Sequence, residues 1–381
     1  MSSRRVLLVH LFSNGDCLMA TTVARQIKED FPDCHLTWAI SYKCKQAIEN
    51  NPFVDSIWSV EHSPDALLYS DLWYQTKRDA ESRRLKGEFD LIYYTQIFPE
   101  NFNNFDGTTR SSIFRSYPRE ITVPVQPVMR LRPDEVERVS RFAAERGLHK
   151  YAHVILFECA PASNQSQLSA DLAIRLANRV VAERADTAFI ISSRHSFDSQ
   201  QPAVIDGSSL SYRENAEISK HCTLLLGCSS GITWLLTSDW AKKLPTIQFL
   251  SPDPPWYAFA SVSYDHRFFG LDTGHILETT LTGEVEMTAM VTRYLAQGTF
   301  NGLSCAELVP SIEQIYRLYV TMHGRIAARR ALRNFVGRNP NVPVSEVAFL
   351  YRIAQLRLGL EARALMGKLT RVAKRISDLG R

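Results

Sequence analysis

The chain has 381 residues, more than one hydrophobic core usually serves, so at least two domains are expected. Hydrophobic residues make up 45% and charged residues 22%, which is typical of a globular protein and excludes a disordered or fibrous chain. No apolar run approaches the ~20 residues needed to cross a bilayer.

The seven cysteines are scattered and contain no C-x-x-C pair, so neither a zinc site nor a disulfide framework is indicated. The ten histidines form no ligand-spaced pair such as H-E-x-x-H, and we expect no metal site. The N-terminus MSSRRVLLVHLF lacks the length and cleavage site of a signal peptide. These features predict a cytoplasmic protein.

The first ~125 residues alternate predicted strands and helices, which favours a parallel sheet with helices on both faces. Residues 96–120 are polar, aromatic and irregular, and we expect a substrate-facing loop there. The predicted strands are Val6–Phe12, His35–Ser41, Ser56–Val60 and Asp90–Thr95, and the predicted helices are Asp16–Phe31 and Lys43–Asn50.

The turn between the first strand and the first helix carries the first candidate site. It contains Asn14, Gly15, which is free to take a positive φ, and Asp16 in the first helical turn. An aspartate there most often caps the helix. Open α/β sheets also bind their ligands at this edge, where a carboxylate could take a proton from an incoming hydroxyl. Both interpretations stay open at this point.

After a linker marked by Pro124 and Pro127, the alternation restarts. This predicts two Rossmann-like domains, residues 1–125 and 126–310, that face each other across a cleft. The second domain has predicted strands at His153–Cys159, Ala188–Ser192, Thr223–Gly227 and Pro245–Leu250, and predicted helices at Pro133–Arg146, Ala170–Arg184 and from Gly231 through Ser238.

A second strand-to-helix turn, at residues 227–234, is rich in small and hydroxyl residues. Backbone N–H groups at a helix start attract anions, so a diphosphate is the natural guest, while a serine-capped helix is the simpler alternative. Neither G-x-G-x-x-G nor G-x-x-x-x-G-K-[ST] occurs, so dinucleotide and P-loop sites are not indicated. The residues concerned are Ser229, Ser230, Gly231, Ile232 and Thr233.

These motifs are similar to those of bacterial glycosyltransferase family 9, the ADP-heptose:lipopolysaccharide heptosyltransferases. The segments that resemble the family are NGDCLMATTVARQIKEDFPDCHLTWAIS, NNPFVDSIWSV and SYRENAEISKHCTLLLGCSSGITWLL. The resemblance spans roughly residues 4–300. It implies a GT-B fold, a nucleotide-diphosphate sugar as co-substrate, no metal, and inversion at the anomeric carbon.

Carried over residue by residue, the resemblance puts the catalytic base on Asp16 and the diphosphate loop on residues 229–233. The sequence departs from the family pattern at Thr22, where a proline is usual, and at Ser229 and Trp234, where Asp and His are usual. The loop 160–166 lacks the usual phosphate lysine. Candidates to replace it in donor binding are Ser163, Gln165, Ser166 and Arg194. Glu158 is a further donor-site candidate, as a ligand of a sugar hydroxyl, as a support for the residues that bind the donor, or as a partner of a nearby base.

The acceptor side is less defined, because scattered basic loop residues are more often simply solvated. The candidates for acceptor binding are Asn14, Gly15, Tyr42, Lys43, Arg110 and Arg115.

The last segment, residues 311–381, is a predicted basic helical extension. From Arg317 onward it has fourteen Lys and Arg against three Asp and Glu. Amphipathic basic helices lie on anionic membranes or pack against protein, and both interpretations stay open. No nucleic-acid-binding motif accompanies the charge.

The sequence therefore predicts an inverting, metal-independent glycosyltransferase that moves a heptose or another hexose or deoxyhexose. The expected acceptor is a bacterial surface glycan or a lipid-linked glycan, reached in the cytoplasm or at the inner membrane face. A homo-oligomer is a further expectation. Two alternatives are a GT-B nucleotide-sugar epimerase or hydrolase, and a non-catalytic glycan-binding or scaffold protein.

Overall fold

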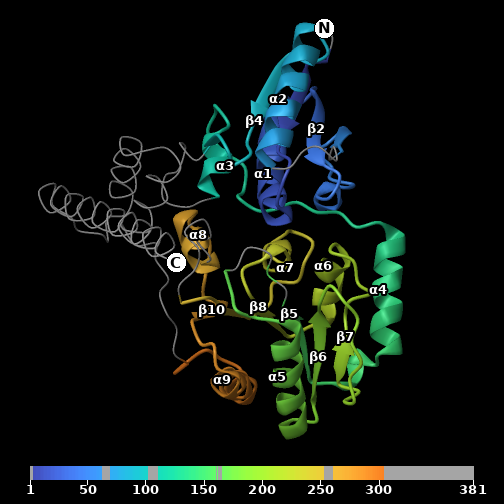
Figure 1. Cartoon of the computed structure of the whole chain (residues 1–381), viewed down its shortest axis with the longest axis vertical. Helices are drawn as coiled ribbons and strands as arrows, with labels where there is room; N and C mark the ends of the chain where they lie inside the picture. The colour runs from blue at the N-terminus through green and yellow to red at the C-terminus, as the bar shows by residue number, and fades with distance from the viewer. Residues whose placement is uncertain are drawn as a thin grey trace, which may run out of the picture. The chain divides into compact units, whose positions relative to one another are not determined.

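The computed structural model describes residues 3–61, 69–101, 110–159, 161, 165–252 and 261–303. The chain divides into two compact units, residues 1–310 and 311–381. The second unit, with the predicted basic helices, lies outside the described residues. The first unit holds two separate parallel sheets, one formed before residue 95 and the other after residue 152 (Figure 1). The boundary at residues 125/126 stays a prediction.

The first sheet has four parallel strands in the order β3-β2-β1-β4. They are β1 (Arg5–Val9), β2 (His35–Ser41), β3 (Ser56–Val60) and β4 (Leu91–Tyr94), and the helices of this half are α1 (Asn14–Asp30), α2 (Tyr69–Leu85), α3 (Ser111–Arg115) and the short η1 (Lys45–Ala47). β1 is therefore shorter than the predicted strand, and Lys43–Asn50 shrinks to a single 3₁₀ turn.

Both faces of this sheet are buried at β1, because successive side chains of the strand point to opposite faces and four of the five are buried. Leu7 and Val9 pack in one core cluster with Leu72 and Trp73 of α2. Val6 and Leu8 point to the opposite face and are fully buried as well. The core thus holds β1 in the centre of the sheet, and its carboxyl end leads directly to α1.

The second sheet has six parallel strands in the order β10-β9-β8-β5-β6-β7. The strands are β5 (His153–Glu158), β6 (Thr187–Ser192), β7 (Val204–Asp206), β8 (Leu224–Gly227), β9 (Thr246–Phe249) and β10 (Ile276–Thr279). The helices are α4 (Pro133–Glu145), α5 (Ala170–Glu183), α6 (Glu214–Ile218), α7 (Gly231–Leu235), α8 (Val262–Phe268) and α9 (Glu284–Gln297), with 3₁₀ turns η3 (Leu148–Lys150) and η4 (Ser219–His221).

Two hydrophobic cores lie on the two faces of this sheet (Figure 1). Phe157 and Phe189 belong to the core that α5 and α9 cover, whereas Leu156 and Ile190 belong to the core that contains α4 residues such as Val139. Because β5 pairs with both β6 and β8, its last residue, Glu158, lies at the centre of the carboxyl edge. This edge is where the candidate site forms.

A buried arginine joins the second half of this unit to the first. Arg213 forms an ion pair with Glu135 at 2.7 Å, and both side chains are 3% exposed. Its guanidinium also donates to the backbone carbonyls of Gln46 at 3.0 Å and Glu49 at 2.9 Å. The planar fork of arginine serves several acceptors at once, which a lysine cannot do.

We therefore expect Arg213→Lys to lower the free energy of unfolding by about 2 kcal/mol, because carbonyl and carboxylate acceptors lose their donors inside the protein. Arg138→Lys is the matched control. The Arg138 side chain, which pairs with Glu214, is 46% exposed. Its substitution should therefore lower the free energy of unfolding by less than about 0.5 kcal/mol. Urea unfolding of both variants measures the difference, and equal losses would contradict a structural role for Arg213.

No helix among the described residues is both long and apolar enough to span a bilayer.

Candidate active site

The first corner brings Asp16 to the carboxyl edge of β1. The positive φ of this turn, 68°, belongs to Ser13 rather than to Gly15, so that expectation was wrong. Gly15 lies inside α1, and a Cβ added there would lie 3.3 Å from Trp234. The glycine is needed for close packing between the two halves, because Trp234 belongs to α7.

Asp16 faces an arginine across this corner. Its Oδ1 lies 3.6 Å from Nε of Arg110, and the Asp16 side chain keeps 20% of its surface exposed. Ser13 occupies the N-cap position, and its side chain makes no capping hydrogen bond. The carboxylate of Asp16 is therefore placed toward a charged partner and remains reachable from solvent.

Arg110 links Asp16 to a second carboxylate. Its Nη1 donates to Oδ2 of Asp265 at 2.9 Å, and its guanidinium carbon lies 3.7 Å from the centre of the Trp234 ring. The Arg110 side chain is only 12% exposed. Arg110, predicted to bind the acceptor, is paired within the chain, because two carboxylates and an aromatic face surround it.

Burial sets the protonation of both carboxylates. Loss of solvent raises the pKa of Asp16, and the positive charge of Arg110 opposes part of that rise. Burial raises the pKa of Asp265 to about 6, again against the effect of Arg110. Asp16 and Asp265 thus share one cation, and both have a pKa above that of a free aspartate. Such a pair of carboxylates can take up a proton near neutral pH.

The second corner is built around the carboxylate of Glu158. The backbone N–H groups of Cys228, Ile232 and Thr233 donate to it at 3.2, 2.8 and 3.2 Å, and the hydroxyls of Ser230 and Thr233 donate as well. Glu158 is 2% exposed. The helix start at 231–233 thus binds an anion, but the anion belongs to the same chain.

This corrects the expectation that residues 229–233 offer free donors to a diphosphate. The N–H groups of Ile232 and Thr233 and the hydroxyl of Ser230 are already bonded to Glu158. Glu158 was predicted to support the donor-binding residues, to bind a sugar hydroxyl or to pair with a nearby base. Its observed partners are the backbone and the hydroxyls of this corner. The reason is topological, since β5 and β8 are neighbours and Phe157 pairs with Leu226.

Amide side chains hold the rest of the corner in place. Gln248 accepts from the backbone N–H of Ser229 at 2.6 Å, and Gln165 donates to the Ser229 carbonyl at 2.9 Å. Ser229 itself has φ 54°, and its hydroxyl is buried without a partner. Gly227 is required here, because an added Cβ would lie 2.3 Å from Gln248.

The other predicted donor residues are dispersed. Ser166 accepts from the backbone of Leu168 at 3.1 Å, and Ser163 lies outside the described residues. Arg194 is exposed after β6, whose Ser192 pairs with Glu158. Arg194, which was predicted to bind the donor, therefore follows the same edge of the sheet as Glu158.

The predicted acceptor residues come from separate elements of the first half. Tyr42 and Lys43 are exposed beside each other, with the ammonium 5.7 Å from the ring centre, and Arg115 is exposed at the end of α3. Asn14 lies at the start of α1 with its side-chain oxygen buried and unpartnered. Among the described residues, no three His, Cys, Asp or Glu side chains are grouped so as to hold a metal ion.

Asp265 and Gln248 are site residues that the sequence did not reveal. Asp265 lies in α8, a seven-residue helix without a recognisable apolar period, and Gln248 sits within a buried strand. The signal present was indirect. Ser229 departs from the family pattern and donates its backbone N–H to Gln248, and Trp234 also departs and stacks with Arg110, the partner of Asp265.

Comparison with known proteins gives a match in structure only. No family model and no curated protein matches the sequence. Among solved structures, a glycosyltransferase of family 9 from Veillonella parvula matches with a TM-score of 0.52 at 14% identity, over 87% of this chain and 98% of that one. The chain shares the GT-B fold. The resemblance to family 9 is thereby confirmed at the level of the fold.

Two other solved structures match this chain with lower TM-scores. ADP-heptose lps heptosyltransferase II of E. coli matches with a TM-score of 0.49 at 11% identity, over 77% of this chain and 99% of that one. A putative UDP-N-acetylglucosamine 2-epimerase of Listeria monocytogenes matches with a TM-score of 0.45 at 11% identity, over 87% and 95%. A shared fold does not by itself imply a shared function, so function has to be argued from the site.

Proposed function

We propose that the chain is an inverting glycosyltransferase that uses a nucleotide-diphosphate sugar, with Asp16 as the catalytic base. The observation that carries the proposal is the Asp16 carboxylate, which is partly exposed at the carboxyl edge of β1 and has a raised pKa. A general base needs contact with solvent or substrate and a pKa nearer neutrality than that of a free aspartate.

In the proposed step, Asp16 accepts the proton of an acceptor hydroxyl as its oxygen attacks the anomeric carbon of the donor sugar. The bond between that carbon and the diphosphate oxygen breaks, and the nucleoside diphosphate leaves with the electron pair. Attack on the face opposite the leaving group inverts the anomeric centre. Proton transfer of this kind contributes about 10²–10⁴-fold in rate.

Arg110 is proposed to position the base. It is held between Asp16 and Asp265 and stacked on Trp234, so its charge is fixed beside the Asp16 carboxylate. That charge keeps the pKa of Asp16 below the value that burial alone would give. A sugar acceptor is proposed to approach the exposed side of Asp16, with Asn14, Tyr42, Lys43 and Arg115 as its proposed contacts.

The diphosphate is proposed to lie outside the corner that Glu158 occupies, because two anions in one buried site repel each other strongly. The exposed Arg194 after β6 supports this placement, since it stands beside the same edge. A guanidinium binds phosphate oxygens in a bidentate manner and neutralises charge that develops on the leaving group.

A direct test is release of nucleoside diphosphate from a panel of nucleotide sugars, each supplied with an oligosaccharide acceptor. The expected result is release that depends on both substrates, with the sugar recovered on the acceptor in inverted configuration. Conversion of the donor to an epimer, or hydrolysis that ignores the acceptor, would contradict the proposal. Donors that bind are first found by their effect on the melting temperature.

The pH profile tests the link between Arg110 and Asp16. Asp16 acts only when ionised, so activity should fall as pH decreases through its raised pKa. Arg110 lowers that pKa, and Arg110→Gln should therefore move the acid limb of kcat/KM to higher pH. Arg141→Gln, an exposed arginine of α4, serves as control and should leave the limb in place. A limb that does not move in Arg110→Gln would remove Arg110 from the proposed mechanism.

A further inference from the structure

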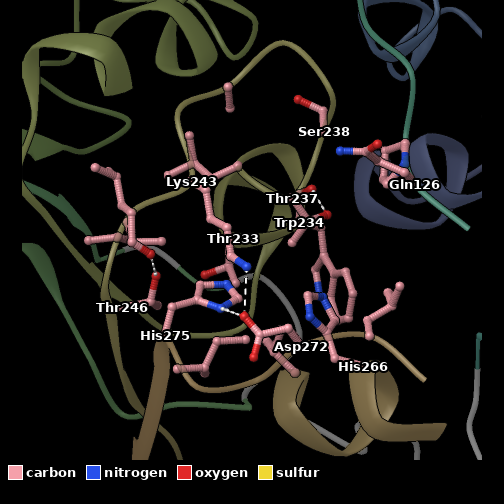
Figure 2. Close-up of a pocket in the computed structure, with 18 of the residues that line it drawn as sticks. Gln126, Thr233, Trp234, Thr237, Ser238, Lys243, Thr246, His266, Asp272 and His275 are labelled. Atoms are coloured by element: carbon pink, nitrogen blue, oxygen red, sulfur yellow. Dashed lines mark hydrogen bonds and ion pairs between the residues drawn. The ribbon is translucent and has the colours of Figure 1, made fainter. Parts of the chain in front are cut away.

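A cavity of about 410 Å³ lies beside the starts of β9 and β10 (Figure 2). Neither Asp16 nor Glu158 lines it, but Thr233 and Gln248 of the Glu158 corner form part of its wall. Residues 124–127, α7 and α8 complete its wall. Its volume is in the range of sites for small organic molecules. None of the residues proposed to take part in sugar transfer, such as Asp16 and Arg194, lines this cavity.

The cavity has an apolar wall and little net charge. Leu236, Leu244 and Phe269 are among its apolar residues. Its charged residues are Lys243 and Asp272, which bind each other at 2.8 Å, and Asp239, which binds Arg130 at 2.8 Å. Each is therefore already paired within the chain. An ionic guest would lose its hydration without gaining a counter-ion, which is costly.

Three buried polar atoms in the lining residues lack a hydrogen-bond partner: Nε1 of Trp234, Nδ1 of His266 and Oγ of Ser238. Nδ1 of His275, by contrast, lies 3.6 Å from Oδ2 of Asp272. Trp234, His266 and Ser238 are 1%, 8% and 4% exposed. Figure 2 shows the rings of Trp234, His266 and His275 around the same space. Buried polar atoms are nearly always paired in proteins, so three around one cavity indicate a missing partner.

The chemistry of these atoms defines the partner. Burial lowers the pKa of His266 to about 4 and also lowers the pKa of His275, so both rings are neutral at pH 7. The His266 ring also forms a hydrogen bond with the backbone of Asp272. This bond raises the pKa of His266, as expected when the ring N–H is the donor. A neutral imidazole has one donor and one acceptor, so Nδ1 of His266 is left as the acceptor, while Trp234 offers only a donor.

We propose that this cavity binds an uncharged planar molecule with a carboxamide or lactam edge. Its carbonyl would accept from Nε1 of Trp234, its N–H would donate to Nδ1 of His266, and its ring would rest on the apolar wall. Trp234 also carries Arg110 on its ring, so such a ligand would touch the residue that supports the Asp16 corner.

Benzamide is the probe, with benzoate as its charged isostere, and the full chain is labelled with ¹⁵N-tryptophan. The chain has six tryptophans, so six indole N–H signals are expected. Benzamide should shift one of them saturably at millimolar concentration, as expected for nine non-hydrogen atoms. Benzoate should bind at least ten-fold more weakly, because its charge finds no partner.

Variants of His266 locate the site. His266→Phe keeps a ring but removes the acceptor, and should weaken benzamide binding at least ten-fold. His266→Asn keeps an acceptor near Nδ1 and should stay within about three-fold of the parent chain. His153→Phe, outside the cavity, should bind as the parent does. The proposal is overturned if benzamide gives no saturable shift, if benzoate binds equally well, or if His266→Phe binds unchanged. Should the Phe variant not fold, the comparison of benzamide with benzoate and the Asn variant decides.

Discussion

Asp16→Asn is expected to slow sugar transfer by about 10²–10⁴-fold, because asparagine keeps the shape of the side chain but cannot accept the acceptor's proton at neutral pH. The variant should stay folded. The ionised carboxylate is partly desolvated, and a neutral amide relieves that cost while it loses the attraction of Arg110. The loss should therefore fall on kcat, with little change in the KM for the donor.

The matched control is Asp171→Asn. Asp171 also lies in the first turn of a helix, α5, where Ser169 provides the cap by accepting from Leu172 at 3.2 Å. If each acid only stabilises its helix by interacting with the helix dipole, both variants should lose at most about 1 kcal/mol of stability and no activity. Transfer that persists in Asp16→Asn would leave interaction with the helix dipole as the better account of this acid and would remove Asp16 as the base.

The sequence predicted two neighbouring strands of the first sheet well, because each is a short run rich in apolar residues with clear ends. His35–Ser41 and Ser56–Val60 have the predicted bounds. α2 escaped prediction, since YSDLWYQTKRDAESRRL carries charge around most of the helix and buries mainly Leu72, Trp73 and Ala80. Its stability comes from packing on the sheet rather than from a visible pattern.

The site was harder to predict because its contacts join distant parts of the chain. Glu158 binds residues some 70 positions later, and Arg110 binds Asp265 at a separation of 155. A motif can show that a helix start attracts an anion, as it did at 229–233. It cannot show which anion arrives, because that depends on which strands become neighbours in the sheet.

Replacing Glu158 should have the largest effect on stability. Glu158→Ala leaves three backbone N–H groups and two hydroxyls without their acceptor at a site that is 2% exposed. Each unsatisfied buried donor costs about 1–3 kcal/mol, although water entering the space would replace part of the loss. We expect the free energy of unfolding to fall by about 3–5 kcal/mol, measured by urea unfolding.

Glu158→Gln separates two roles for this carboxylate. If Glu158 is a permanent part of the corner, the amide is a poor acceptor for five donors, and stability should fall by about 2–3 kcal/mol without any gain in donor affinity. Glu137→Gln, exposed on α4, should change neither quantity. If Glu158 instead only holds the place of a diphosphate, removing its charge should tighten donor binding, because repulsion between two anions disappears. A well-folded Gln variant with tighter donor binding would therefore return the diphosphate to residues 229–233 and contradict its proposed position beside Arg194.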